Sequence, residues 1–250
     1  MADDQTARPG FAPSHKWDRN FFLILLGFIW LAILVGFGSD MARHFKTHEA
    51  PYPLIVHFHA AAFVGWLVLL TVQIFLIRFN KWHIHKRLGI FGACLAIVMV
   101  ILGPATAMIV DGMGYLKDHQ PPVFLAVQFT DIGAFAGLVA AAILLRRTSA
   151  AHKRLILLAT LYITDAGFAR FLGDPLEKLL GDSPPATWCV LYLCSFLLVL
   201  ALGIYDLVTR KRLHPAYIGG VAWIVVMQVT GVTLLLSPWW APISMHFIGH

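Results

Sequence analysis

Long apolar runs separated by short polar stretches occur seven times along this chain of 250 residues. The runs lie at about residues 21–38, 53–77, 88–110, 123–145, 155–172, 186–208 and 217–236. Each is close to the roughly 20 residues that an α-helix needs to cross a bilayer. Because lipid offers no partner to backbone polar groups, the runs must be helical. The pattern therefore predicts an all-α, polytopic membrane helix bundle with seven transmembrane helices.

The composition agrees with a membrane location. Hydrophobic residues make up 59% of the chain and charged residues only 13%, which is more apolar surface than a soluble domain of this length can bury. The first run lacks a small-x-small cleavage site, so we expect it to stay as an anchor. We therefore predict a cytoplasmic tail at residues 1–20 and a single transmembrane domain at residues 21–250.

Lysine and arginine are unevenly distributed between the two sides of the predicted bundle. Fourteen of the nineteen fall in the N-terminal tail and in the segments after the second, fourth and sixth runs, and five fall on the other side. The positive-inside rule then puts the N-terminus in the cytoplasm and the C-terminus outside. Small loops and this charge bias predict a multi-pass protein of a bacterial inner membrane. The net charge of +6 mostly reflects the same asymmetry and gives no reason to expect nucleic acid.

The tetrapeptide HKRL occurs twice, at residues 85–88 and 152–155, each time where an apolar run begins. Both copies follow a helix that ends in arginine, so helices 2 and 3 resemble a hairpin that is repeated as helices 4 and 5. We expect these hairpins, residues 53–110 and 123–172, to form the core of the bundle. The other helices are expected at its periphery, at residues 21–38, 186–208 and 217–236.

The cationic residues of both copies suit a membrane interface. Basic residues at helix ends contact lipid headgroups and set the topology. We expect this role for Lys86, Arg87, Lys153 and Arg154.

The histidines of the repeat allow a second interpretation. His85 and His152 each begin a helix that runs outward from the cytoplasmic side, so they share a depth if these helices are neighbours. Haem iron with two axial imidazoles needs one neutral histidine from each of two facing helices. The adjacent cations could then pair with the haem propionates. Gly89 and Gly92 would let a flat ring approach helix 3, although small residues equally serve helix packing.

A resemblance to a known family favours the haem interpretation. The segments VHFHAAAFVGWLVLLTVQIFLIRF and NKWHIHKRLGIFGACLAIVMVILG are similar to the second and third helices of the cytochrome b561 family, and AHKRLILLATLYI is similar to its fifth. The resemblance covers about residues 53–172 and implies four histidines on consecutive helices that hold two b-type haems. By position, His59 or His57 matches helix 2, His85 matches helix 3 and His152 matches helix 5.

The fourth helix departs from the family pattern because it contains no histidine. The cytoplasmic pair, His85 with His152, stays complete, whereas the outer site keeps only His59 as a candidate metal ligand. The resemblance therefore implies one haem b more strongly than two. The HKRL helix starts are also similar to those of bacterial multipass membrane proteins.

Polar side chains occur at similar depth in the outer half of the predicted bundle. His59, Asp131 and Asp165 each lie about 9–12 Å from the outer end of a helix that rises 1.5 Å per residue. An unpaired carboxylate at this depth costs about 2.5–3.5 kcal/mol, so Asp131 and Asp165 should both face the bundle and find partners. His57 lies about 200° around the helix from His59, so only one can face the core, and we favour His59.

Gln128 and Arg170 lie close enough in sequence to join this outer group. One interpretation is a structural network, such as an ion pair between Asp131 and Arg170, that specifies helix packing without chemistry. The other is a pocket that binds a metal, carries protons for a quinol or holds a small molecule.

Three functions follow from these patterns. The first is a membrane haem b protein that transfers electrons between a quinol or small reductant and an acceptor, and is an oxidoreductase if it is an enzyme. The second is a membrane enzyme or transporter centred on His59, Asp131, Asp165 and Arg170. The third is a cofactor-free structural or assembly subunit. Membrane lipid is an expected partner throughout, a quinone belongs to the first function, and a homo-oligomer or larger membrane complex is compatible with each.

Overall fold

The computed structural model describes residues 11–12, 14–48 and 50–249. All secondary structure in this part of the chain is α-helical. The helices are α1 (Asp18–Lys46), α2 (Leu54–Arg78), α3 (Trp82–Asp118), α4 (Leu125–Leu144), α5 (Ser149–Tyr162), α6 (Asp165–Leu180), α7 (Pro184–Arg210), α8 (Pro215–Leu235) and α9 (Trp240–Phe247).

Seven stretches of helix in the described ranges are long and apolar enough to cross a membrane, which confirms the predicted number and the all-α class. One stretch, Ser149–Leu180, is interrupted at Ile163 and Thr164, where α5 ends and α6 begins. The sequence predicts one continuous helix there, because apolar composition does not record a break in backbone hydrogen bonding. The sequence also does not predict α9, a short helix of 8 residues.

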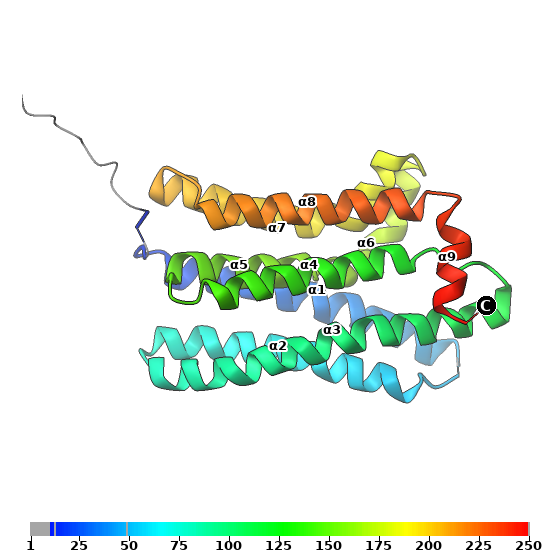
Figure 1. Cartoon of the computed structure of the whole chain (residues 1–250), viewed down its shortest axis with the longest axis horizontal. Helices are drawn as coiled ribbons and strands as arrows, with labels where there is room; N and C mark the ends of the chain where they lie inside the picture. The colour runs from blue at the N-terminus through cyan, green and yellow to red at the C-terminus, as the bar shows by residue number, and fades with distance from the viewer. Residues whose placement is uncertain (1–10, 13, 49, 250) are drawn as a thin grey trace, which may run out of the picture.

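The helices lie roughly side by side along the long axis of the molecule (Figure 1). The start of α1 and the turns at residues 79–81, 145–148 and 211–214 gather at one end, which we call the basic end for its lysines and arginines. We call the opposite end, beside which α9 lies, the far end. In Figure 1, α7 and α8 lie along one side, α2 and α3 along the other, and α1, α4, α5 and α6 between them.

The helices α4 and α5 form the centre of the bundle. The sequence predicts a peripheral position for α8, whereas α8 packs against both α4 and α5. Glycines make this approach close: a Cβ on Gly220 would lie 2.5 Å from a methyl carbon of Leu158, and a Cβ on Gly231 would lie 2.5 Å from Thr130 Oγ1. The hairpin α2–α3, expected in the core, lies at the edge and joins the centre mainly through packing of α3 on α4.

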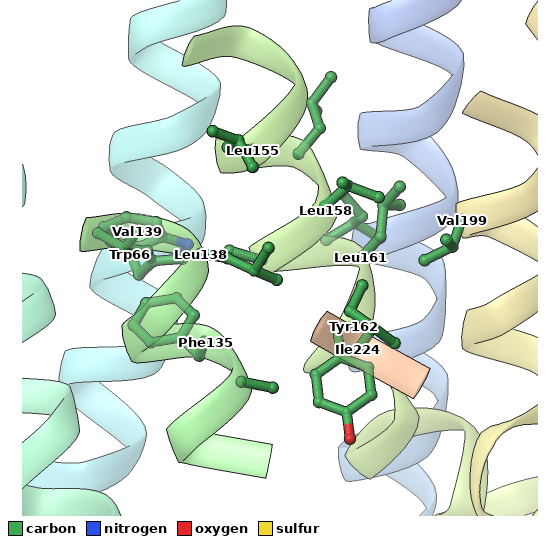
Figure 2. Close-up of a cluster of buried hydrophobic side chains, with 14 of the residues drawn as sticks. Trp66, Phe135, Leu138, Val139, Leu155, Leu158, Leu161, Tyr162, Val199 and Ile224 are labelled. Carbon is green, nitrogen blue, oxygen red and sulfur yellow. The ribbon is translucent and has the colours of Figure 1, made fainter. Parts of the chain in front are cut away.

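A large apolar cluster holds the central helices together (Figure 2). Its members include Trp66, Phe135, Leu138, Val139, Leu155, Leu158, Leu161, Tyr162, Val199 and Ile224. Trp66 also donates a buried hydrogen bond of 3.1 Å from Nε1 to Thr160 Oγ1 on α5. The hydroxyl group of Tyr162 points away from the leucines (Figure 2), toward the polar residues described below. The apolar cluster therefore borders a polar site.

The helices α1 and α6 cross with their backbones nearly in contact. A Cβ on Gly36 would lie 2.1 Å from the carbonyl oxygen of Gly167, and a Cβ on Gly167 would lie 2.6 Å from the carbonyl oxygen of Ala32. Small residues at a crossing allow such close packing between membrane helices. This contact fixes α6 against α1 just beyond the break.

Candidate functional site

The two repeated histidines meet at the basic end. His85 lies in the first turn of α3 and His152 in the first turn of α5, and their ring centroids are 6.4 Å apart with the planes at 86°. A metal–imidazole bond of about 2.1 Å from each ring fits within this separation. The side chains meet although α3 packs mainly on α2 and α4, and α5 mainly on α4, α7 and α8. The predicted common depth of the two imidazoles is therefore confirmed.

The orientation of His152 is set by the backbone of α4. Its Nδ1 lies 2.9 Å from the carbonyl oxygen of Ala142. A carbonyl oxygen only accepts hydrogen bonds, so Nδ1 carries a proton, and in the neutral ring the lone pair is therefore on Nε2. Metal-binding histidines commonly use a backbone carbonyl in this way. The hydrogen bond thus orients His152 with Nε2 as its available ligand atom.

His85 is held differently. Its backbone carbonyl accepts a hydrogen bond of 3.2 Å from Gln73 Nε2 on α2. Its Nδ1 is buried and has no hydrogen-bond partner among the described residues. An unpaired buried nitrogen is costly, so a group that it could bind would stabilise this position. The donor set, two imidazoles from two helices, fits a bis-histidine iron.

The neighbouring residues take different places from those that the haem interpretation needs. Gly89 and Gly92 face α2, where their Cβ positions lie 3.8 Å from Gln73 Nε2 and 3.0 Å from a methyl carbon of Leu69. These glycines therefore serve packing of α3 on α2. Two apolar hollows of about 260 and 330 Å³ lie between α3 and α4, and neither is lined by a histidine.

The four cations of the HKRL copies divide into two groups. Lys86 and Arg87 are exposed at the basic end, as an interfacial position requires. Arg154 is fully buried, and the expectation that it contacts lipid headgroups is wrong. Its Nε and Nη2 donate hydrogen bonds of 2.6 and 2.5 Å to the two carboxylate oxygens of Asp206 on α7. The charge of Arg154 is therefore paired with the carboxylate of Asp206 and not with a haem propionate.

Lys153 belongs to the same ionic network. Its Nζ donates to Asp18 Oδ2 at 2.8 Å, and Arg210 donates to both oxygens of Asp18 at 2.8 Å. Tyr205 donates a further hydrogen bond of 2.6 Å to Asp18. The network ties α1, α5 and α7 together at the basic end. The sequence pattern missed Asp206, although a carboxylate inside an apolar run is a detectable signal for a buried ion pair.

A second polar site lies toward the far end. Asp131 Oδ1 accepts hydrogen bonds from the hydroxyl groups of Tyr162, at 2.7 Å, and Tyr192, at 3.4 Å. Both tyrosines are fully buried and their rings are stacked with centroids 5.9 Å apart. Asp165 lies close enough to Asp131 for the two carboxyl groups to interact. Both carboxylates are predictable from the sequence as charges within apolar runs, whereas the tyrosines that hold them are not.

The expected ion pair between Asp131 and Arg170 is not formed. Arg170 Nε lies 3.6 Å from Asp40 Oδ2 on α1, and its guanidinium group stacks over Phe37 at 3.9 Å. The reason is the crossing of α1 and α6, which places Asp40 closer to Arg170 than Asp131 is. Gln128 also points elsewhere, beside Asp111 of α3.

The two histidines of α2 differ as expected from their spacing. His57 is exposed, whereas His59 is partly buried and stacks on Phe63 with ring centroids 4.2 Å apart. His59 faces α3 near the carbonyl group of Leu102. In the part of the chain that the structure describes, no group of three or more His, Cys, Asp or Glu side chains is arranged to hold a metal ion.

Comparison of the chain with protein-family models, curated proteins and solved structures finds no match. The described part of the chain is an all-α bundle with seven helical stretches that are long and apolar enough to cross a membrane. Its function must be inferred from the two sites themselves.

Proposed function

We propose that the protein is a membrane haem b protein that transfers single electrons between a quinol or small reductant and an acceptor. The observation that carries the proposal is the meeting of His85 and His152 across 6.4 Å at the basic end. Two imidazoles from separate helices are the usual axial ligands of a b-type haem within a helix bundle. The bound haem would supply one-electron chemistry, and its potential would follow from burial and nearby charge.

The residues around the pair have distinct roles in this proposal. His152 is oriented by the carbonyl group of Ala142, which leaves its Nε2 available as the ligand atom. His85 offers a buried nitrogen without a partner among the described residues. Of the four cations in the two HKRL copies, Lys86 and Arg87 are exposed and are suited to pair with propionates. Arg154 instead stabilises the bundle through Asp206.

The resemblance to the cytochrome b561 family supports one haem at this pair. In that family the partner of the second-helix histidine lies on helix 4, and α4 of this chain has none. The side chain at the corresponding depth on α4 is Asp131, which accepts hydrogen bonds from tyrosines. A second haem at His59 would therefore lack an imidazole on the opposite helix. We propose a location in the bacterial inner membrane, with the basic end in the cytoplasm, on the charge bias.

Haem titration of the protein, purified in detergent from cells starved of haem precursor, tests this proposal. The expected result is saturable binding of about one haem per chain, followed by the Soret band. His85→Ala and His152→Ala should each weaken binding at least about tenfold, as loss of a metal-site residue does. His57→Ala, which removes an exposed histidine from α2, is the matched control and should bind as the unsubstituted protein does. Equal binding by all four proteins would overturn the proposal.

A further inference from the structure

The two histidines of the proposed haem site are held unequally. His152 donates from Nδ1 to the carbonyl oxygen of Ala142, on the helix that precedes its own. The Nδ1 atom of His85 is buried and has no hydrogen-bond partner among the described residues. A histidine that binds a metal through one ring nitrogen almost always donates from the other, which fixes the ring and selects its tautomer. His85 therefore lacks the acceptor that His152 already has.

The side chain of Gln73 lies against His85 and carries an acceptor that nothing uses. Its Nε2 donates a hydrogen bond of 3.2 Å to the backbone carbonyl oxygen of His85. Its Oε1 is buried and has no partner among the described residues. A carbonyl oxygen only accepts, so Nε2 must face it and the amide cannot be reversed without losing this bond. Two residues in contact thus hold an unsatisfied acceptor and an unsatisfied ring nitrogen, each of which is costly while it is buried alone.

Gly89 leaves room for this amide. It follows His85 by one turn on the same face of α3, and a Cβ there would lie 3.8 Å from Gln73 Nε2. A long side chain at this position would occupy the space in which the amide lies. The absence of a side chain on Gly89 therefore keeps α3 open to Gln73 directly beside the histidine.

The arrangement follows the repeat of the two hairpins. In the second hairpin, α4 supplies the carbonyl oxygen of Ala142, ten residues before His152. In the first hairpin, α2 brings the amide of Gln73, twelve residues before His85, to the start of α3. Each copy of HKRL thus has an oxygen near it from the helix that precedes it, and only the second copy uses that oxygen for its ring nitrogen.

We propose that Gln73 is the positioning residue of His85, with its Oε1 as the acceptor of the Nδ1 proton. The side chain already contacts His85 through Nε2, so side-chain rotation is enough to form the pair. The buried Nδ1 is then satisfied by the amide, and Nε2 is left as the ligand atom. The inference rests on the proposed function, since it assigns a role in haem ligation. An acceptor on Nδ1 makes the imidazole more basic, which favours ferric iron and lowers the reduction potential.

The tautomer of His85 in the haem-free protein is the first test. Nitrogen-15 NMR of the histidine rings in the full chain, with the His85 signals assigned by their loss in His85→Ala, should place the proton on Nδ1. Gln73→Leu and Gln73→Glu both lose the hydrogen bond from Nε2 to the backbone, but only glutamate keeps an acceptor. Gln73→Leu should therefore reduce the Nδ1-protonated fraction several-fold, and Gln73→Glu should keep it. The control is Gln128→Leu, at a half-buried glutamine of α4, which should leave the tautomer unchanged.

Haem affinity and reduction potential of the same variants are the second test. Gln73→Leu should weaken haem binding at least about tenfold and raise the potential, whereas Gln73→Glu should bind haem and lower the potential. A merely structural role of the Nε2 bond would make the two variants behave alike. Equal shifts in both variants, or an Nδ1 proton that Gln73→Leu does not affect, would overturn the inference. Absence of haem binding in every protein would overturn the proposed function instead, and the tautomer would still decide the role of Gln73.

Discussion

Arg154 and Asp206 form a buried ion pair with two parallel hydrogen bonds, of 2.6 and 2.5 Å, between α5 and α7. Both side chains are completely inaccessible. The third guanidinium nitrogen donates to the carbonyl group of Ala150 at 2.8 Å. Arg210 adds a longer contact of 3.5 Å to Asp206. The arginine that the sequence predicts at the lipid surface is thus a central element of helix packing.

Removing either partner of this pair should lower the free energy of unfolding, and the loss should be larger when Asp206 is removed than when Arg154 is removed. Asp206→Leu leaves the guanidinium group of Arg154 buried without a carboxylate, so we expect a loss of about 3–5 kcal/mol in the free energy of unfolding. Arg154→Met should cost less, because Arg210 still contacts Asp206. Chemical unfolding in detergent micelles, followed by circular dichroism, measures both.

The double variant Arg154→Met with Asp206→Leu should recover most of the loss, since apolar residues of similar volume often replace a buried pair at little cost. The exposed Arg43, which pairs with the half-buried Asp40, is the control, and Arg43→Met should change the free energy of unfolding by less than about 1 kcal/mol. If the double variant is as unstable as Asp206→Leu, the ion pair is not the source of the effect.

Because α1 packs closely on α6, alanine substitutions at two glycines of α1 should have very different effects on stability. Gly36→Ala puts a methyl group 2.1 Å from the carbonyl oxygen of Gly167, so the helices must move apart. We expect a loss of at least about 1–3 kcal/mol, typical of overpacking. Gly38→Ala meets no atom within 4 Å and should be neutral or gain up to about 1 kcal/mol from helix propensity. The yield of folded protein and its Tm distinguish the two, and equal Tm values would contradict the crossing.

The environment of His214, in the turn between α7 and α8, predicts that the stability of the protein depends on pH. Its Nδ1 accepts a hydrogen bond of 3.1 Å from the backbone N–H of Ala216, which caps α8. Burial, and after it the charge of Arg154, lower the pKa of His214 below its ordinary value of 6.5, while Asp206 opposes the shift and Arg210 and Lys153 add to it. The unfolded chain then binds more protons than the folded one under acid conditions.

The contribution of His214 to the free energy of unfolding should therefore be complete above pH about 6.5 and fall as the pH drops through that value. His214→Asn keeps a side-chain acceptor for the cap but does not titrate, so its Tm should vary less between pH 7.5 and 5.5. An identical pH profile for both proteins would show that His214 does not cause the dependence.

The sequence predicts the membrane bundle well because seven apolar runs are a strong and local signal. The common depth of His85 and His152 is also predictable, since both open helices that start at the same side. The break at Ile163 and Thr164 is not, because it depends on where backbone hydrogen bonds fail within an apolar segment. The expectation of an ion pair between Asp131 and Arg170 is also wrong, because it too depends on how the helices pack.

Partners across helices depend on rotation and crossing, and these are set by packing. Gly36 and Gly167 bring α1 close enough for Asp40 to engage Arg170, and Gly231 brings α8 beside Tyr192. Composition shows that such glycines exist but not which helix each one faces. Single polar residues within apolar runs, such as Asp206 and Gln228, are the signal that could have identified the remaining buried contacts.

The visible absorption spectrum of the protein, ferrous minus ferric, tests the central claim most directly. Two imidazole ligands from His85 and His152 predict a narrow low-spin spectrum, lost in His85→Ala and in His152→Ala but kept in His57→Ala. Haem-supplemented cells should yield this coloured protein at about one haem per chain. A colourless protein free of iron after haem supplementation, or a spectrum unchanged in both histidine variants, would contradict the assignment of the pair as haem ligands.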